Sequence, residues 1–177
     1  MIYLLGVDHR IQHDGPLGPR PEHTEAFINA VTKMIDELDI EILMEEYNED
    51  AKRWDQVTQS VIEKIAYAKE LEHIFCEPSL EERKANGILT ETQIFKKLGF
   101  DNLTDLNVEQ KALVDEEQIK HYAVREVLWY DTIKDDIESN MLCVIGASHI
   151  STFGNLLKKK GNDHKVLSEN WCLENLS

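Results

Sequence analysis

The sequence lacks long apolar stretches and has few cysteines. No window approaches the roughly 18 consecutive apolar residues that a membrane-spanning helix requires. The N-terminal Met1–Leu5 carries no basic residue ahead of its apolar ones, so we expect no secretory signal. The widely spaced Cys76, Cys143 and Cys172 form no CxxC pair and predict no disulfide framework. A reducing cytoplasm therefore suits the chain best.

Basic residues are also scarce. The 34 Asp and Glu against 19 Lys and Arg give a net charge of −15 at pH 7. A surface this acidic repels phosphate backbones and anionic membranes, so we expect neither a long nucleic acid nor a membrane as a partner. The remaining composition is 42% hydrophobic and 30% charged over 177 residues, which is typical of one folded domain.

Short apolar runs alternate with amphipathic segments along the chain. The predicted strands cover residues 2–8, 40–44, 73–77, 141–145 and 165–167. The predicted helices cover 24–38 (capped by Thr24), 54–71, two short segments between 79 and 105 near Gly87 and Gly99, 107–137 (capped by Asn107), and 151–160. Residues 9–23 hold three prolines and two glycines and are expected to lack regular structure.

The alternation of strands and helices predicts an α/β fold with a small, mostly parallel sheet flanked by helices. We expect one domain over 1–177, with a helical insertion around 79–139. Right-handed crossovers place the carboxyl ends of all parallel strands at one edge of the sheet, where open α/β sheets bind ligands.

The same short motif follows the first and fourth predicted strands. Gly6-x-x-His9 comes after the first strand, and Gly146-x-x-His149 comes after the fourth. A single Gly-x-x-His carries little information, but two at strand ends are moderately specific. If the two strands are neighbours, His9 and His149 face a common crevice.

Glu45 and Glu46 follow the second predicted strand. With His9 and His149, Glu45 supplies the donors for a divalent metal, or a histidine base and an orienting carboxylate. Burying both glutamates without partners is costly, so solvation of one of them is the alternative. We expect a site formed by His9, Glu45 and His149.

Further polar residues have less specific signals. The loop after the first strand adds His13, Asp14, Glu22 and His23. We expect these to be exposed loop residues, although the length of the loop leaves a functional role open. Arg125 lies off the apolar stripe of the long helix. It forms either a surface ion pair or a stacking contact, with Trp129 four residues on, or else a clamp on a substrate oxyanion or a site carboxylate.

The order Gly6-x-x-His9, Glu45, Arg125 and Gly146-x-x-His149 resembles the EreA/ChaN-like, TIKI/TraB (GumN) superfamily. The resemblance covers roughly a third of the chain and is best over residues 125–161. It implies a small α/β sheet with its site at the strand ends and roles for His9, Glu45, Arg125 and His149.

Members of this superfamily include metal-dependent peptidases, metal-independent esterases and a haem-associated lipoprotein. Two features depart from the pattern of TraB-type sequences. The helical insertion between the middle strands is short, and no arginine follows Glu45 by a few residues, since the nearest is Arg53. These departures bear on the substrate class more than on the fold.

The leading hypothesis is a hydrolase that activates water. In its metal-dependent form, His9, Glu45 and His149 hold Mn, Co, Fe or Zn, which lowers the pKa of bound water. Glu46 or Asp8 is then the general base. In its metal-free form, a histidine is the base and Glu45 orients it.

In both forms of this hypothesis, Arg125 stabilises the oxyanion. The runner-up is a protein that binds a metal, haem or a small ligand without turnover. A third hypothesis is a metal-dependent phosphoesterase or nucleotide hydrolase. The expected partner is a small-molecule or peptide substrate, and the sequence leaves a homo-oligomer open.

Overall fold

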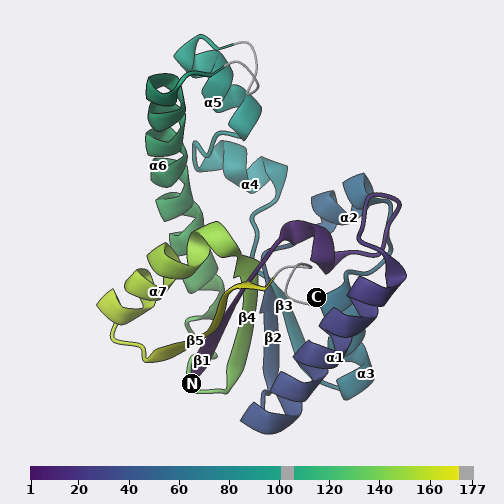
Figure 1. Ribbon diagram of the computed structural model, residues 1–177. Coiled ribbons are helices and arrows are strands. Elements are labelled where there is room, and N and C mark those ends of the chain that lie inside the picture. The colour runs from purple at the N-terminus through teal and green to yellow at the C-terminus, as the bar shows by residue number, and fades with distance from the viewer. Residues whose placement is uncertain (101–105, 172–177) are drawn as a thin grey trace.

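The computed structural model describes residues 1–100 and 106–171 and contains one parallel sheet (Figure 1). Its strand order is β3-β2-β4-β1-β5, and every pairing is parallel. The strands are β1 (Ile2–Val7), β2 (Ile42–Glu45), β3 (Glu72–Phe75), β4 (Met141–Gly146) and β5 (His164–Trp171). The helices are η1 (His9–Gln12), α1 (Pro21–Leu38), α2 (Glu49–Asp55), α3 (Val61–Lys69), α4 (Leu80–Ala85), α5 (Glu91–Leu98), α6 (Val108–Ile133), η2 (Ala147–His149) and α7 (Ile150–Lys159).

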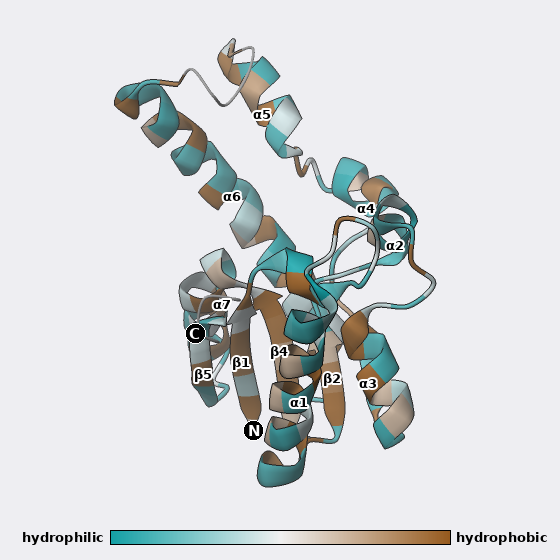
Figure 2. Cartoon of the chain, turned by 45° about the vertical axis from the view of Figure 1, so that its right-hand side comes forward, coloured by the Kyte–Doolittle hydropathy of each residue, from teal (hydrophilic) through white to brown (hydrophobic). Residues whose placement is uncertain are grey.

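Helices cover both faces of this sheet. Helices α1 and α3 pack on one face, and α6 and α7 pack on the other (Figures 1 and 2). The predicted α/β class with a parallel sheet flanked by helices is confirmed. The first and fourth strands are neighbours, which is the condition for a crevice shared by His9 and His149, and Val7 of β1 pairs with Gly146 of β4.

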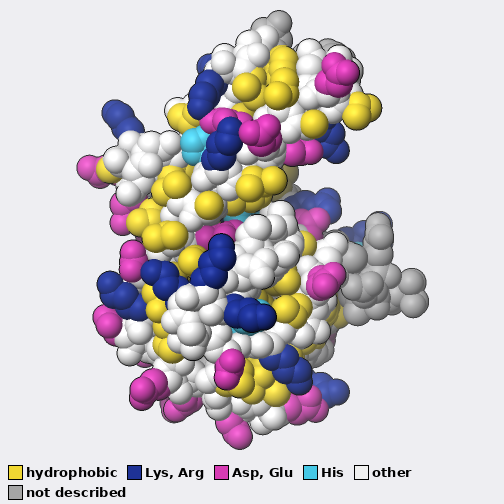
Figure 3. Space-filling model, turned by 90° about the vertical axis from the view of Figure 1, so that its left-hand side faces the viewer, with side chains coloured by type: hydrophobic (Ala, Val, Ile, Leu, Met, Phe, Trp, Pro, Cys, Tyr) yellow, Lys and Arg dark blue, Asp and Glu magenta, His cyan; other side chains and the backbone are white. Residues whose placement is uncertain are grey.

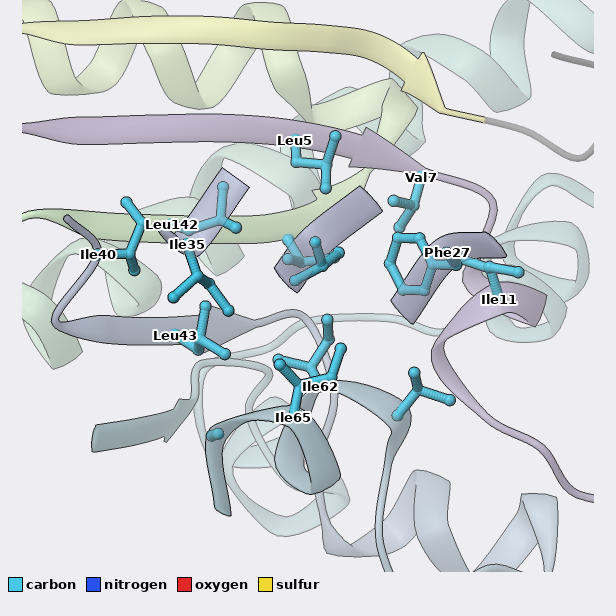
Figure 4. Close-up of a cluster of buried hydrophobic side chains, with 14 residues drawn as sticks. Leu5, Val7, Ile11, Phe27, Ile35, Ile40, Leu43, Ile62, Ile65 and Leu142 are labelled. Atoms are coloured by element: carbon cyan, nitrogen blue, oxygen red, sulfur yellow. The ribbon is translucent and has the colours of Figure 1, made fainter. Parts of the chain in front are cut away.

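Consecutive strand residues point into different cores because side chains alternate across a sheet. Leu5 belongs to the core beneath α1 and α3, which is shown in Figure 4, whereas Leu4 belongs to the core beneath α6 and α7. In β2, Leu43 faces the first core and Met44 faces the second. The same alternation, continued past the end of β2, sends Glu45 and Glu46 to opposite sides.

Helices α4, α5 and α6 connect β3 to β4, and the distal part of α6 stands away from the sheet together with α5 (Figure 1). A separate small core of Ile94, Phe95 and Val114 holds α5 to α6. Figure 3 views the molecule from the side of α6 and α7 and shows hydrophobic side chains interspersed with charged ones. The exposed apolar residues of α6 include Leu113, Ile119, Val124 and Val127.

Several predicted boundaries are wrong. The loop expected to be irregular contains η1, and α1 begins at Pro21 rather than after Thr24. Proline suits the first helical turn because the amide hydrogen it lacks would have no partner there. The helix predicted over 54–71 is two helices, α2 and α3, because Gln56 adopts a left-handed conformation and Ser60 starts a new capping box.

Other boundaries lie closer to the prediction. Asn107 caps α6 as expected, but the helix ends at Ile133 rather than at 137. Cys76 and Cys143 are free and buried, while Cys172 and part of the predicted segment 79–105 lie outside the described residues. In the part of the chain that the structure describes, every helix is too short or too polar to cross a bilayer.

Candidate functional site

A cluster of charged side chains lies at the carboxyl ends of β1, β2 and β4. Glu46 is at its centre, immediately after β2. Its Oε1 lies 3.6 Å from Nε2 of His9 and 3.6 Å from Nε2 of His149. Its Oε2 accepts a hydrogen bond of 2.7 Å from the backbone N–H of Gly146. The guanidinium of Arg125 also donates to Oε1. The two predicted histidines therefore meet at Glu46.

The surroundings of Glu46 favour its ionised form. Burial alone would raise the pKa of this carboxyl. The electrostatic influence of His9, Arg125 and His149 and the hydrogen bond from Gly146 outweigh burial and lower its pKa. Glu46 is thus a buried carboxylate that is stable only because these groups compensate its charge.

Arg125 is buried and joins two carboxylates. Its Nε and Nη2 donate to Oε2 of Glu77 at 3.1 and 2.5 Å, in addition to its bond with Glu46. Its guanidinium lies 5.3 Å from the ring of Trp129 and 5.7 Å from that of Tyr122. Burial opposes the charged form, but the two glutamates raise the pKa of Arg125 above its ordinary value. A surface ion pair is therefore excluded for Arg125, whereas the alternative of a contact with the Trp129 ring is confirmed.

His149 is enclosed and only 1% exposed. Its Nδ1 lies 2.8 Å from Oε1 of Glu126, which also accepts from the hydroxyl of Thr152 at 2.5 Å. Tyr122 and Trp129 pack against the ring with centroid distances of 4.2 and 4.7 Å. These contacts fix the ring with Nε2 toward Glu46.

His9 occupies a different environment, since 53% of its side chain is exposed. Its Nδ1 lies 2.8 Å from Oε1 of Gln12, and its Nε2 faces Glu46. A Cβ on Gly146 would lie 2.5 Å from Nε2 of His9 and 3.1 Å from Oε2 of Glu46. Glycine at 146 therefore allows the close approach of imidazole and carboxylate.

Glu45 lies on the opposite side from Glu46, as the strand alternation requires. Its Oε1 accepts from the hydroxyl of Ser60 and lies 2.8 Å from Nε2 of His73, and its Oε2 accepts from Gln12 at 3.4 Å. Burial raises the pKa of Glu45 despite the hydrogen bonds from His73 and Ser60. The structure thus places Glu45 away from Nε2 of His9 and away from Nε2 of His149. Both glutamates are buried with partners, so the alternative of one solvated glutamate is wrong.

The remaining predicted residues are spread around η1. Asp8 caps η1 and pairs with Arg10 at 2.6 Å, and the hydrogen bonds from Arg10 lower the pKa of this carboxyl. Asp14 bonds Lys64 at 2.6 Å on the surface, and Glu22 is exposed.

Two histidines of the same loop are less exposed than expected. His13 is only 5% exposed, so the expectation of an exposed His13 is wrong, and its Nε2 lies 3.7 Å from Asp55. His23 is half-buried.

The three donors predicted to bind a divalent metal do not form one group, because Glu45 lies apart from His9 and His149. Glu45 bonds Ser60, His73 and Gln12 on the other side, and the guanidinium of Arg125 occupies the Glu46 oxygen that both site histidines face. A cation there would lie against that positive charge. Within residues 1–100 and 106–171, no three His, Cys, Asp or Glu side chains form a group that could hold a metal ion. The arrangement of His9, Glu45 and His149 does not fit a resident metal.

A cavity of about 360 Å³ opens beside the cluster. Its walls include His9, His13, Glu46, Glu77, Arg83 and Arg125. A second cavity of about 390 Å³ lies between α6 and the segment around α5, and it shares Arg83 and Arg125 with the first. Trp54, which is 65% exposed, lines the second cavity. The two cavities are thus adjacent, with His9 and Glu46 in the wall of the first.

Sequence patterns give weak signals for Gln12, Glu77 and Glu126. Glu77 comes shortly after β3, so the rule that polar residues at the carboxyl ends of parallel strands share one edge of the sheet applies to it as it does to Glu45 and Glu46. Glu126 neighbours Arg125, but the helical pattern gives no sign that both are buried. Gln12 lies in the segment expected to be irregular, and η1 turns its side chain inward.

No protein-family model matches the chain, and neither a curated protein nor a solved structure matches it significantly.

Proposed function

We propose that this protein is a hydrolase of carbonyl esters or amides in which His9, held beside Glu46, activates water without a resident metal. The observation that carries the proposal is the pairing of His9 with Glu46. An exposed imidazole in a cavity wall has its Nε2 3.6 Å from the oxygen of a buried carboxylate. General bases in water-activating enzymes need this combination of access, orientation and a compensating charge.

The separation of His9 and Glu46 suits a bridging water. A single water within hydrogen-bonding distance of both groups donates one hydrogen to Nε2 of His9 and the other to Oε1 of Glu46. His9 accepts the proton as the water oxygen attacks the substrate carbonyl, and it passes this proton to the leaving alcohol or amine as the tetrahedral intermediate collapses. Glu46 orients the water and compensates the imidazolium that forms.

The carboxylate beside His9 supports this role. Oε1 of Glu46 faces Nε2 of His9 and also accepts from Arg125, whereas Glu77 pairs with Arg83 and Arg125 and Glu126 pairs with His149. A buried carboxylate in this place attracts the positive charge that the imidazole acquires as it takes the proton from water.

Arg125 has two roles in this proposal. It holds Glu46 in place, and it lines both cavities. Negative charge that develops on the substrate oxygen in the first cavity is attracted by the guanidinium. His149, enclosed by aromatic rings and bound to Glu126, accepts from Nη1 of Arg125 at 3.4 Å and so helps to hold the guanidinium beside Glu46.

The two adjacent cavities support an extended small-molecule or peptide substrate. The scissile carbonyl lies at His9, and an apolar group lies in the second cavity against Trp54. The resemblance to a superfamily that contains metal-independent esterases agrees with this assignment.

A reporter panel tests the reaction class. Purified protein is incubated with carboxylic esters, amides and phosphodiesters, with a chelator or with added manganese, and its metal content is measured by plasma mass spectrometry. We expect hydrolysis of a carbonyl compound in the presence of the chelator. Cleavage of phosphodiesters only with manganese would instead establish the metal-dependent phosphoesterase. Haem binding with a Soret band and no hydrolysis would establish the binding protein without turnover.

A further inference from the structure

A buried amide links the two consecutive glutamates to the same histidine. Gln12 is fully buried at the end of η1. Its Nε2 donates to Oε2 of Glu45 at 3.4 Å, and its Oε1 lies 2.8 Å from Nδ1 of His9. Glu45 therefore reaches Nδ1 of His9 through Gln12, while Glu46 faces Nε2 of the same ring.

The polarity of this chain is set by its outer end. Glu45 accepts hydrogen bonds from Ser60 and from Gln12, so the N–H side of the amide turns toward the carboxyl group. The carbonyl oxygen of Gln12 then faces the imidazole. An oxygen acceptor at 2.8 Å requires a hydrogen on Nδ1 of His9. A neutral ring with this hydrogen keeps its lone pair on Nε2, on the side of Glu46 and the cavity.

We propose that Gln12 is a positioning residue that selects the tautomer of His9, with its amide held in orientation by Glu45. The ring is half exposed, so solvent alone would not hold it in one tautomer. Neutral imidazole in free histidine carries its hydrogen mainly on Nε2, which would remove the lone pair that faces the cavity. The effect of Gln12 on the rate rests on the proposed function, but its effect on the tautomer does not.

The anchor of the chain is rigid. Ser60 starts α3 through a capping box, and its hydroxyl both accepts from the backbone of Glu63 and donates to Glu45. His73 on β3 binds the same oxygen of Glu45. The orientation of His9 thus depends on residues from the opposite face of the sheet. A substitution of Glu45 should therefore change the orientation of the His9 ring, although Glu45 does not line the first cavity.

Long-range ¹H–¹⁵N correlation spectra of the histidine rings test the proposal, recorded above about pH 8, where imidazole is neutral. The signals of His9 are identified by their loss in His9→Gln. In the wild type we expect the hydrogen on Nδ1. In Gln12→Met, which keeps the length of the side chain without its amide, we expect a shift toward the Nε2–H tautomer. His149, whose Nδ1 faces Glu126, is the internal control and stays unchanged.

A second variant keeps the test decisive if Gln12→Met fails to fold. Glu45→Gln replaces the carboxyl by an amide that also offers a donor, and we expect it to yield a mixture of His9 tautomers. A wild-type His9 with its hydrogen on Nε2, or unchanged His9 tautomers in folded Gln12→Met or Glu45→Gln, overturns the proposal.

Kinetics separate this proposal from the proposed function. On any ester that the wild type hydrolyses, we expect Gln12→Met to lower kcat by at least about tenfold with KM unchanged. A changed tautomer in a protein that hydrolyses nothing leaves the positioning role intact and refutes the hydrolase. A changed tautomer with undiminished kcat refutes the role of Gln12 in catalysis.

Discussion

Replacement of Gly146 by alanine should separate catalysis from stability. The backbone at Gly146, with φ −57° and ψ 139°, suits alanine, and the N–H bond to Glu46 remains. The added Cβ would lie 2.5 Å from Nε2 of His9, whereas ordinary contact begins at 3.4 Å, so the ring must retreat by about 0.9 Å. A displacement of this size at a reacting group costs about 100-fold in kcat, or about 2.7 kcal/mol of transition-state stabilisation.

The cost to the fold should be small because His9 is half exposed and can rotate outward. We expect the free energy of unfolding of Gly146→Ala to change by less than about 1 kcal/mol in urea titrations. Gly154→Ala is the matched control, since its Cβ would lie 2.8 Å from Nε2 of His164, outside the candidate site. Full activity in Gly146→Ala, or an equal loss of kcat in Gly146→Ala and Gly154→Ala, would refute the reasoning.

Three further predictions concern the charges and the second cavity. Arg125→Met removes the buried guanidinium that Glu46 and Glu77 share, which leaves Glu77 with Arg83 alone, and should lower the free energy of unfolding by about 3–5 kcal/mol. Arg53→Met, which breaks an exposed pair, should cost less than about 1 kcal/mol, and equal effects in urea titrations would contradict the burial argument. The folded pKa of Glu45 is raised, so its contribution to stability is complete below its ordinary pKa of 4.5 and is lost as the pH rises through the folded pKa. The free energy of unfolding of Glu45→Gln should therefore increase relative to that of the wild type as the pH rises above 4.5, and an opposite slope would show that the pKa of Glu45 is lowered. Trp54→Ala should raise KM several-fold for esters with a bulky apolar group and leave kcat unchanged, while an unchanged KM would place the substrate elsewhere.

The sequence predicts the centre of the sheet well because strands β1, β2 and β4 are buried on both faces. Runs such as Met141–Ile145 are apolar throughout, and this is the pattern that parallel strands between two helical layers require. The two Gly-x-x-His segments follow such runs, so their meeting at one edge of the sheet follows from topology. Helix boundaries follow less directly from the sequence, because Pro21 is compatible with both a loop and a first helical turn and because nothing in the sequence marks the left-handed conformation of Gln56.

The choice between Glu45 and Glu46 shows what the sequence leaves open. Strand alternation places one of the two on the side of the long helix, but which one depends on the faces that Leu43 and Met44 pack against. Both are apolar, so the pattern of β2 gives no preference. Tertiary contacts decide, and they also bring Gln12 and Glu126 to the histidines from segments with no motif.

The most direct test of the proposed water activation compares His9→Gln with His13→Gln in the presence of a chelator, on the ester that the wild type hydrolyses fastest. Both histidines line the first cavity, but only His9 faces Glu46, because Nε2 of His13 lies 3.7 Å from Asp55. We predict that His9→Gln loses about 10²- to 10⁴-fold in kcat, while His13→Gln stays within a few-fold of the wild type. Undiminished hydrolysis by His9→Gln would contradict the assignment of His9 as the base.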